Sequence, residues 1–149
     1  YHHDIIGVNS RLDTLQAAIL KVKLNYLDEY ARKRNEVASY YDANLSGNRA
    51  IDIPFRSSNS THVFHQYTLK LKGINRNDFR DHLAANGVPT MVYYPVPLHL
   101  QKAYFQPDFG EGSFPVTEKL SETVISLPIH TEMNGEQLDF IVSSIKGYQ

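Results

Sequence analysis

The chain begins with a long stretch of helical periodicity. Between Leu12 and Ser46 there is neither glycine nor proline, so nothing in this stretch interrupts a helix. Apolar residues recur there at three- and four-residue steps, at Leu12, Leu15, Ile19, Val22 and Tyr26. This spacing predicts one long helix or two helices that abut. We expect Ser10 to cap it, with Asp13 near its positive end, and Gly47 to end it.

A second apolar stripe widens the face that this helix would bury. It consists of Leu20, Leu24 and Leu27. The combined surface is wider than one small sheet would cover, which favours packing of part of it on protein outside this chain. A helix held wholly inside the core of one domain explains the pattern equally well.

The middle of the chain predicts a strand, a helix and a second strand. Residues 62–71 alternate in polarity and are rich in aromatic and branched types, which indicates a strand. One face of that strand would carry Val63, His65, Tyr67, Leu69 and Leu71. Asn75 is expected to cap a helix that stops at Gly87. The following strand, residues 88–94, would end at the proline-rich triplet 95–97, because proline lacks the backbone donor.

The last third of the chain predicts shorter elements. We expect a short helix at 102–105, a helix from Pro115 to Ser121, and a strand at 124–127. Asn134 and Gln137 form the pattern of a capping box that begins the final helix. The inner face of this helix would carry Leu138, Ile141, Val142 and Ile145. Strands interleaved with helices predict a small α/β domain, an α+β arrangement of two layers.

Composition narrows the partners and the compartment. With 149 residues, 42% of them hydrophobic, the chain can bury one ordinary core. A net charge of −1 offers no electrostatic footprint for nucleic acid or for an anionic membrane, so we expect neither partner. The absence of cysteine, of a leader and of an apolar run of about 20 residues favours a cytoplasmic protein. Because a polar turn, Gly7–Asp13, stands at the very start of the chain, we expect a piece of a larger protein.

The seven histidines are the first candidates for chemistry. Their spacing does not favour a metal site, since His2 and His3 are adjacent and His62 and His65 would point to opposite faces of a strand. His65 on an apolar strand face is typical of a core histidine bonded to backbone, although an acid–base or binding role is also open.

The stretch Tyr93–His99 has a different character. Two prolines stiffen the exit from a strand, so that Tyr94 and His99 project from a rigid corner where they could bond hydroxyl or phosphate groups of a ligand. A proline-stiffened packing corner is the alternative. Glycine-rich phosphate loops and nucleophile-elbow serines are absent, which argues against nucleotide binding by those devices and against a hydrolase triad.

Several separated motifs occur together in one order. They are Gly7–Asp13 with Gln16–Leu20, His62–Tyr67, Tyr94–His99, Phe114–Pro115 with Glu118, and Ser126–Pro128. In this combination the chain resembles the DegT/DnrJ/EryC1/StrS sugar aminotransferases, pyridoxal-phosphate enzymes of the aspartate-aminotransferase fold (fold type I). The resemblance covers nearly the whole chain, but only the C-terminal portion of the family.

The resemblance implies a division of the chain and an activity. Residues 1–24 would end the large cofactor-binding domain and start the linking helix, and residues 25–149 would form the small domain, with a mostly antiparallel sheet packed by helices. The full enzyme would move an amino group, usually from glutamate, onto a nucleotide-linked keto-sugar in amino-sugar or surface-polysaccharide biosynthesis. The catalytic lysine would lie upstream, so this chain alone is expected to be inactive.

The resemblance also implies roles for five residues. Asn9 would reach across a homodimer with shared active sites to the phosphate of the neighbour's pyridoxal phosphate, with Arg11 adding charge. A surface ion pair is the alternative for Arg11. His99 and Tyr94 become candidate contacts to the nucleotide-sugar substrate, and His65 is a third candidate for which a structural role is equally open.

Two rival functions remain at this point. Some members of the same family carry histidine in place of the upstream lysine and dehydrate the sugar, and only the upstream residue separates the two chemistries. A stand-alone binding or interaction module, with the broad apolar helix as its docking face, is the second rival.

Overall fold

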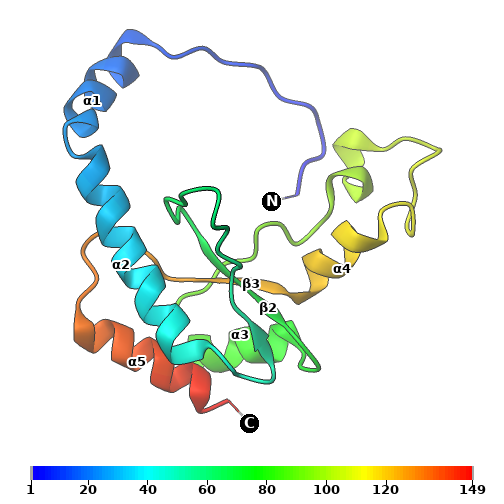
Figure 1. Cartoon of the computed structure of the whole chain (residues 1–149). Helices are drawn as coiled ribbons and strands as arrows, with labels where there is room; N and C mark the ends of the chain where they lie inside the picture. Colours follow the sequence, from blue (N-terminus) through cyan, green and yellow to red (C-terminus); the bar gives the residue numbers. More distant parts are fainter. Residues whose placement is uncertain (1, 149) are drawn as a thin grey trace.

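A computed structural model describes residues 2–148 of the chain (Figure 1). Its α-helices are α1 (Thr14–Leu24), α2 (Leu27–Leu45), α3 (Arg76–Ala85), α4 (Pro115–Thr123) and α5 (Gly135–Lys146). Its strands are β1 (Ile51–Asp52), β2 (Tyr67–Leu71) and β3 (Val124–Leu127), and short 3-10 turns form η1 (Leu98–Leu100) and η2 (Lys102–Tyr104). This is the α/β class that the sequence predicts.

The strands of the described residues form one small antiparallel sheet in the order β1-β2-β3. Ile51 pairs with Leu71 at one edge, and Leu69 pairs with Ile125 in the centre. Along β2 the residues alternate between the core and the other face, so Tyr67, Leu69 and Leu71 are all buried. The mostly antiparallel sheet is therefore confirmed.

The core lies between this sheet and the helices α2, α3 and α5. Helix α2 packs against α5, and α3 packs against β3. The helical side chains buried there are Val37, Ala38, Tyr41 and Leu45 from α2, Phe79 and Leu83 from α3, and Leu138, Ile141, Val142 and Ile145 from α5. The predicted inner face of the final helix is thus confirmed in full.

Local capping signals account for most helix boundaries. Asn75 caps α3, and Asn134 and Gln137 form the predicted capping box of α5. The predicted cap of the first helix was wrong: Asp13, not Ser10, accepts the N–H of Gln16 at 2.7 Å. The helix begins at Thr14, so Asp13 directly precedes it and its carboxylate reaches the free N–H groups of the first turn. Ser10 lies three residues earlier, in the segment before the helix.

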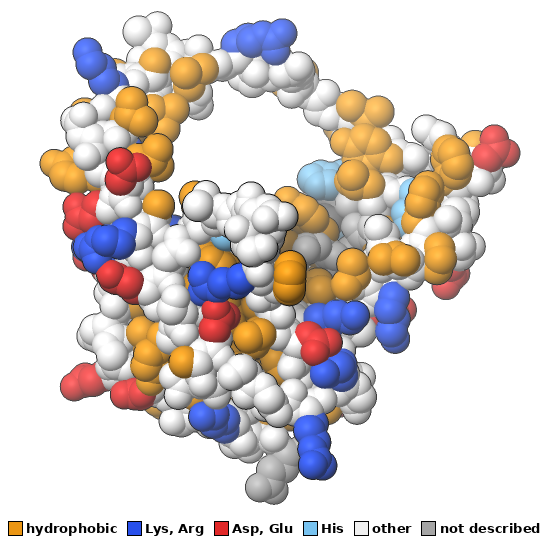
Figure 2. Space-filling view, viewed as in Figure 1, with side chains coloured by type: hydrophobic (Ala, Val, Ile, Leu, Met, Phe, Trp, Pro, Cys, Tyr) orange, Lys and Arg blue, Asp and Glu red, His pale blue; other side chains and the backbone are white. Residues whose placement is uncertain are grey.

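Helix α1 and the residues before it form an arch that stands away from the core (Figure 1). None of the side chains of α1 is buried, and Leu15 is 73% exposed. The N-terminal end of the arch contacts the rest of the domain, where Ala103 donates its N–H to the carbonyl of His3 at 3.0 Å. In Figure 2 hydrophobic side chains rim the opening that the arch encloses. The first helical stretch is therefore two helices, and only the second of them enters this core.

The strand predicted at 62–71 begins only at Tyr67, which is a correction. Phe64 adopts a left-handed backbone conformation, with φ of 46°, and its N–H binds Nδ1 of His62 at 2.8 Å. This turn shifts the alternation by one position, so Phe64 is buried while Val63 and His65 are exposed. His65 therefore does not lie on the apolar face that the pattern assigned to it.

The remaining predictions differ mainly in extent. The strand predicted at 88–94 contracts to a single bridge between Met91 and Ser126, and the helix predicted at 102–105 is one 3-10 turn. The α4 helix starts at Pro115 as predicted and runs on to Thr123. The two-residue strand β1 was not predicted. Among the described residues, no helix has the length and apolarity needed to span a membrane.

Candidate functional site

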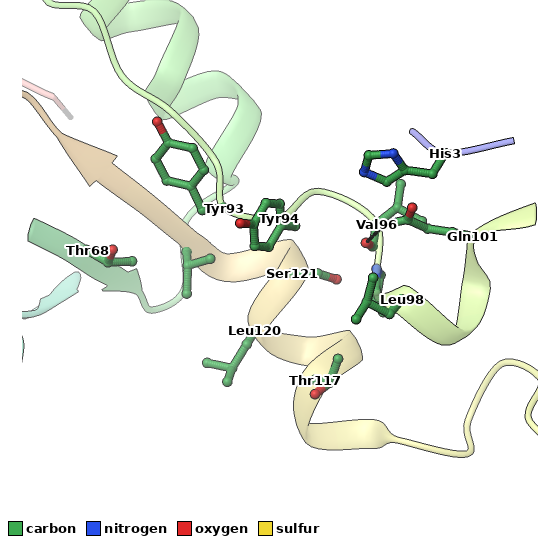
Figure 3. A pocket seen from close by; sticks show the side chains of 12 residues that line it. His3, Thr68, Tyr93, Tyr94, Val96, Leu98, Gln101, Thr117, Leu120 and Ser121 are labelled. Carbon is green, nitrogen blue, oxygen red and sulfur yellow. Dashed lines mark hydrogen bonds between the residues drawn. The ribbon is translucent and has the colours of Figure 1, made fainter. Parts of the chain in front are cut away.

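The stretch Tyr93–His99 with its two prolines is called the proline corner below. A cavity of about 520 Å³ lies where this corner faces β2 and α4 (Figure 3). Its wall is mostly apolar and includes Tyr94, Leu98 and Leu120. Thr117 and Ser121 of α4 bring hydroxyl groups to the same wall. An apolar cavity with a few polar groups is the usual form of a small-molecule site. The structure therefore places Tyr94, one of the predicted substrate contacts, at a cavity with this character.

The proline corner is held by backbone bonds and by a buried amide. The N–H of Leu100 binds the carbonyl of Pro97 at 3.0 Å, which closes the turn η1. Gln101, only 5% exposed, donates its side-chain amide to the carbonyl of Val96 at 3.1 Å. Its Oε1 atom is buried without a hydrogen-bond partner among residues 2–148. Two hydrogen bonds thus hold the corner in addition to its two prolines.

His99 is the last residue of this corner, Tyr93–His99, and does not line the cavity. Its Nε2 atom is 2.9 Å from Oε1 of Glu118, and its side chain is 9% exposed. The imidazole ring also packs edge-to-face on Phe114, with 4.8 Å between the ring centroids. His99 therefore contacts α4 and the loop before it, whereas Tyr94 of the same corner lines the cavity.

Glu118 gathers several donors on one carboxylate. It accepts the N–H of Gly112 on both oxygens, at 3.0 and 2.9 Å, and the N–H of Phe114 at 3.1 Å. These backbone bonds, followed by the contact to His99, hold the pKa of Glu118 below its ordinary value. The carboxylate is consequently ionised at neutral pH.

The sequence analysis gave Glu118 no role. A signal for it exists, because the first N–H groups of α4 and of the loop before it need acceptors, and an acidic residue in the first turn can reach back to them. The pairing with His99 carries no comparable signal, since the two residues are 19 positions apart and belong to different elements.

His65 lies apart from Tyr94 and His99. It borders a neighbouring cavity of about 250 Å³ that it shares with Tyr93 and Ser126. Its backbone carbonyl accepts a hydrogen bond from Arg34 at 3.2 Å, and the same guanidinium nitrogen also binds the carbonyls of Phe64 and Ile129. Tyr93 lines both this cavity and the one at the corner.

Asn9 and Arg11 lie on the exposed arch before α1. Arg11 donates to Oδ1 of Asn9 at 3.1 Å. Both side chains are exposed, and an amide and a guanidinium carry N–H donors of the kind that bind a phosphate. The donor set therefore fits the phosphate of pyridoxal phosphate. Within residues 2–148 there is no cluster of three or more metal-ligating side chains.

The model of the DegT/DnrJ/EryC1/StrS aminotransferase family matches residues 1–146. The chain is 38% identical over 148 residues to a dTDP-3-amino-3,6-dideoxy-alpha-D-galactopyranose transaminase from Aneurinibacillus thermoaerophilus, covering 99% of the chain and 39% of that protein. It is 40% identical over 145 residues to a UDP-2-acetamido-2-deoxy-3-oxo-D-glucuronate aminotransferase from Pseudomonas aeruginosa, covering 97% of the chain and 39% of that protein.

Solved structures give the same relationship. DesV from S. venezuelae superposes with a TM-score of 0.85 at 35% identity, over 98% of this chain and 39% of DesV. A DegT DnrJ EryC1 StrS aminotransferase from Brucella abortus superposes with a TM-score of 0.81 at 34% identity, over 95% of this chain and 37% of that one. The chain thus spans about two fifths of the length of these relatives. It belongs to the DegT/DnrJ/EryC1/StrS aminotransferase family.

Proposed function

We propose that this chain is the C-terminal portion of a pyridoxal-phosphate enzyme that transfers an amino group, from glutamate, to a keto-sugar linked to a nucleotide. The observation that carries the proposal is the similarity along 99% of the chain to a protein named as a dTDP-sugar transaminase. A second relative is named for a UDP-linked oxo-sugar. The shared chemistry of these two names is amination of a nucleotide-linked sugar, which defines the substrate class.

The proposed division of the chain places residues 1–24 with an upstream cofactor-binding domain and residues 25–149 in the small domain. Exposure of every α1 side chain supports it, because an apolar helix face left in water is unfavourable by about 25 cal/mol for each Å². The match covers only 39% of the first relative, so a full-length protein of similar size would have room for an upstream domain with the catalytic lysine. This chain would then contribute binding groups rather than the covalent chemistry.

The proposed cofactor contacts are Asn9 and Arg11. In a homodimer with shared active sites, the exposed arch would bring their N–H groups to the phosphate of the neighbouring subunit's pyridoxal phosphate. The cofactor, when bound, supplies an electron sink for the proton shifts of amine transfer. The role of this chain is to anchor the phosphate, which positions the cofactor for the partner's chemistry.

The proposed substrate contacts are Tyr94, His99 and His65. Tyr94 lies at the apolar cavity, and its phenol can exchange hydrogen bonds with a sugar hydroxyl or a phosphate. His99 ends the same corner and contacts Glu118, and His65 borders the adjacent cavity. We propose a cytoplasmic location for the enzyme, in keeping with a chain that has no cysteine.

The experiment uses the full-length protein, loaded with pyridoxal phosphate and supplied with glutamate and a panel of dTDP- and UDP-linked 3-keto- and 4-keto-sugars. Formation of both 2-oxoglutarate and an amino-sugar nucleotide is expected. A dehydrated sugar without glutamate consumption would overturn amine transfer.

For the cofactor contact, Asn9→Ala is expected to weaken retention of pyridoxal phosphate in an absorbance titration, whereas Asn59→Ala, in an exposed loop, serves as the matched control. Equal affinities in the two variants would remove Asn9 from the site.

A further inference from the structure

The contact between Glu118 and His99 determines which imidazole nitrogen carries the proton. The carboxylate of Glu118 already accepts two backbone N–H groups, from Gly112 and Phe114, and an N–H group can only donate. These bonds favour the ionised acid, which has no proton to give. Nε2 of His99 must therefore be the donor in the 2.9 Å contact.

This assignment leaves Nδ1 as the other functional atom of the ring. A neutral imidazole carries one proton, so an Nε2–H ring has an acceptor lone pair at Nδ1. Across residues 2–148, the buried side-chain polar atom without a partner is Oε1 of Gln101, and Nδ1 of His99 makes no hydrogen bond. Nδ1 is therefore not among the fully buried atoms, although the whole side chain is only 9% exposed.

The surroundings of the ring restrict its rotation. The turn before α4 is attached to Glu118 through Gly112 and Phe114, and the ring of Phe114 covers His99 from the side. Phe109 packs on Phe114 in turn, with 5.6 Å between centroids. Gly112 has a φ of +86°, a left-handed conformation that suits glycine and lets its N–H face the carboxylate. The carboxylate of Glu118 thus binds Nε2 of His99 and also holds Phe114, whose ring packs on the imidazole.

We propose that Glu118 is a positioning residue, which fixes His99 as the Nε2–H tautomer so that Nδ1 accepts a hydrogen bond from a hydroxyl of the sugar. The second half of this statement rests on the proposed function, because it takes His99 as a substrate contact. The chemistry is specific: a neutral Nδ1 selects a hydroxyl donor, and it offers nothing to an ionised phosphate.

The tautomer is tested by ¹⁵N spectra of the full-length protein labelled at histidine, at mildly alkaline pH where imidazoles are neutral. The signal that disappears in His99→Gln is that of His99. A protonated Nε2 and an unprotonated Nδ1 are expected, and Glu118→Ala is expected to shift this pattern. Glu122→Ala is the matched control, because Glu122 is an exposed acid of the same helix. A protonated Nδ1 in the unmodified protein would overturn the proposal.

The role in substrate binding is tested by a double-mutant cycle with His99→Ala, Glu118→Ala and both changes together. Glu118→Ala is expected to raise the KM for the nucleotide sugar about three- to ten-fold, the range for one lost hydrogen bond. The half-reaction with glutamate should be less affected. Because Glu118 acts through His99, its loss should have little further effect once His99 is alanine. Equal effects in both backgrounds would overturn the positioning role.

Two further variants keep the result interpretable. Glu118→Gln retains one carbonyl acceptor and should restore part of the affinity if Glu118→Ala folds poorly. His99→Gln retains a donor near the position of Nε2 but lacks Nδ1, so it should keep the turn and still lose affinity. If the unmodified enzyme turns over no nucleotide sugar, the proposed function fails and the sugar contact fails with it. The ¹⁵N spectra then still decide the tautomer independently.

Discussion

The phenol of Tyr67 donates a hydrogen bond to Oδ1 of Asp42 across 2.7 Å, which joins β2 to α2 inside the core. Arg56 forms an ion pair with the other oxygen of the same carboxylate and lies over the ring of Phe64, 4.4 Å from its centroid. Burial, followed by the bond to Asp42, raises the pKa of Tyr67 well above its ordinary value. Tyr67 is consequently a neutral donor at neutral pH.

Loss of this donor should destabilise the small domain. Tyr67→Phe removes only the hydroxyl and is expected to lower the free energy of unfolding by about 1 kcal/mol, because a partly buried acceptor loses its bond. Urea unfolding of the full-length protein measures this change in free energy. Tyr104→Phe, at a half-exposed phenol in η2, is the control and should be neutral. Equal midpoints for the two variants would contradict the prediction.

Arg34 should hold the turn at Phe64. One guanidinium nitrogen lies 3.3, 3.2 and 3.0 Å from the carbonyls of Phe64, His65 and Ile129. Arg34→Met is expected to lower the free energy of unfolding by about 1–3 kcal/mol, since it leaves part-buried carbonyls without their donor. Hydrogen exchange at residues 64–66 should accelerate in this variant.

The control for Arg34 is Arg32→Met, on the exposed side of the same helix. Arg32 forms a surface ion pair with Glu36, and such pairs contribute about 0–1 kcal/mol. If the two substitutions had equal effects on exchange at 64–66, the three carbonyl contacts would be irrelevant to the turn.

The capping box of α5 offers a test of local stability. Asn134 accepts the N–H of Gln137 at 2.9 Å, and Gln137 accepts the N–H of Asn134 at 3.0 Å. Asn134→Ala is expected to lower the free energy of unfolding by about 1 kcal/mol, and Asn134→Asp should preserve it. Thermal unfolding of both variants measures the difference. A loss of the same size in both would show that an oxygen acceptor at this position is not what matters.

Stability should fall on acidification partly through Glu118. Its pKa is lowered in the folded protein, chiefly by the N–H groups of Phe114 and Gly112, so the ionised form favours folding. The unfolded chain takes up the proton first as pH falls through the ordinary glutamate range. The contribution is therefore complete at neutral pH and disappears as pH falls through the lowered folded value. Melting temperatures of the unmodified protein and Glu118→Gln should converge on acidification, and a constant gap would refute the linkage.

The helices illustrate what could be predicted from sequence. The caps at Asn75 and Asn134, the proline at the start of α4 and the four apolar residues of α5 all act within one or two turns of chain. The same locality explains why the break between α1 and α2 was left open. No glycine or proline marks it, and only the backbone at Asn25 and Tyr26 shows where the first helix ends.

The site illustrates what could not. The corner Tyr93–His99 was predicted from its prolines, but the partner of His99 is a carboxylate 19 positions away. Gln101 had no signal at all, because its burial depends on how the corner packs against the rest of the domain. His65 was misplaced for a related reason. Phe64 has a left-handed backbone, and Arg34, which binds the carbonyl of His65, belongs to α2, so alternation along one strand indicates neither feature.

Local pattern therefore decided the fold class and the starts of α3, α4 and α5, because these depend on residues close in sequence. The resemblance to a family came from separated motifs in one order. The tertiary structure alone decided that β1 is a strand, since two residues become one only by pairing with β2. It also decided that the face of α1 stays outside this core and that His99 faces Glu118. Such contacts join distant segments, and their geometry depends on the packing of the whole domain rather than on any stretch of its sequence.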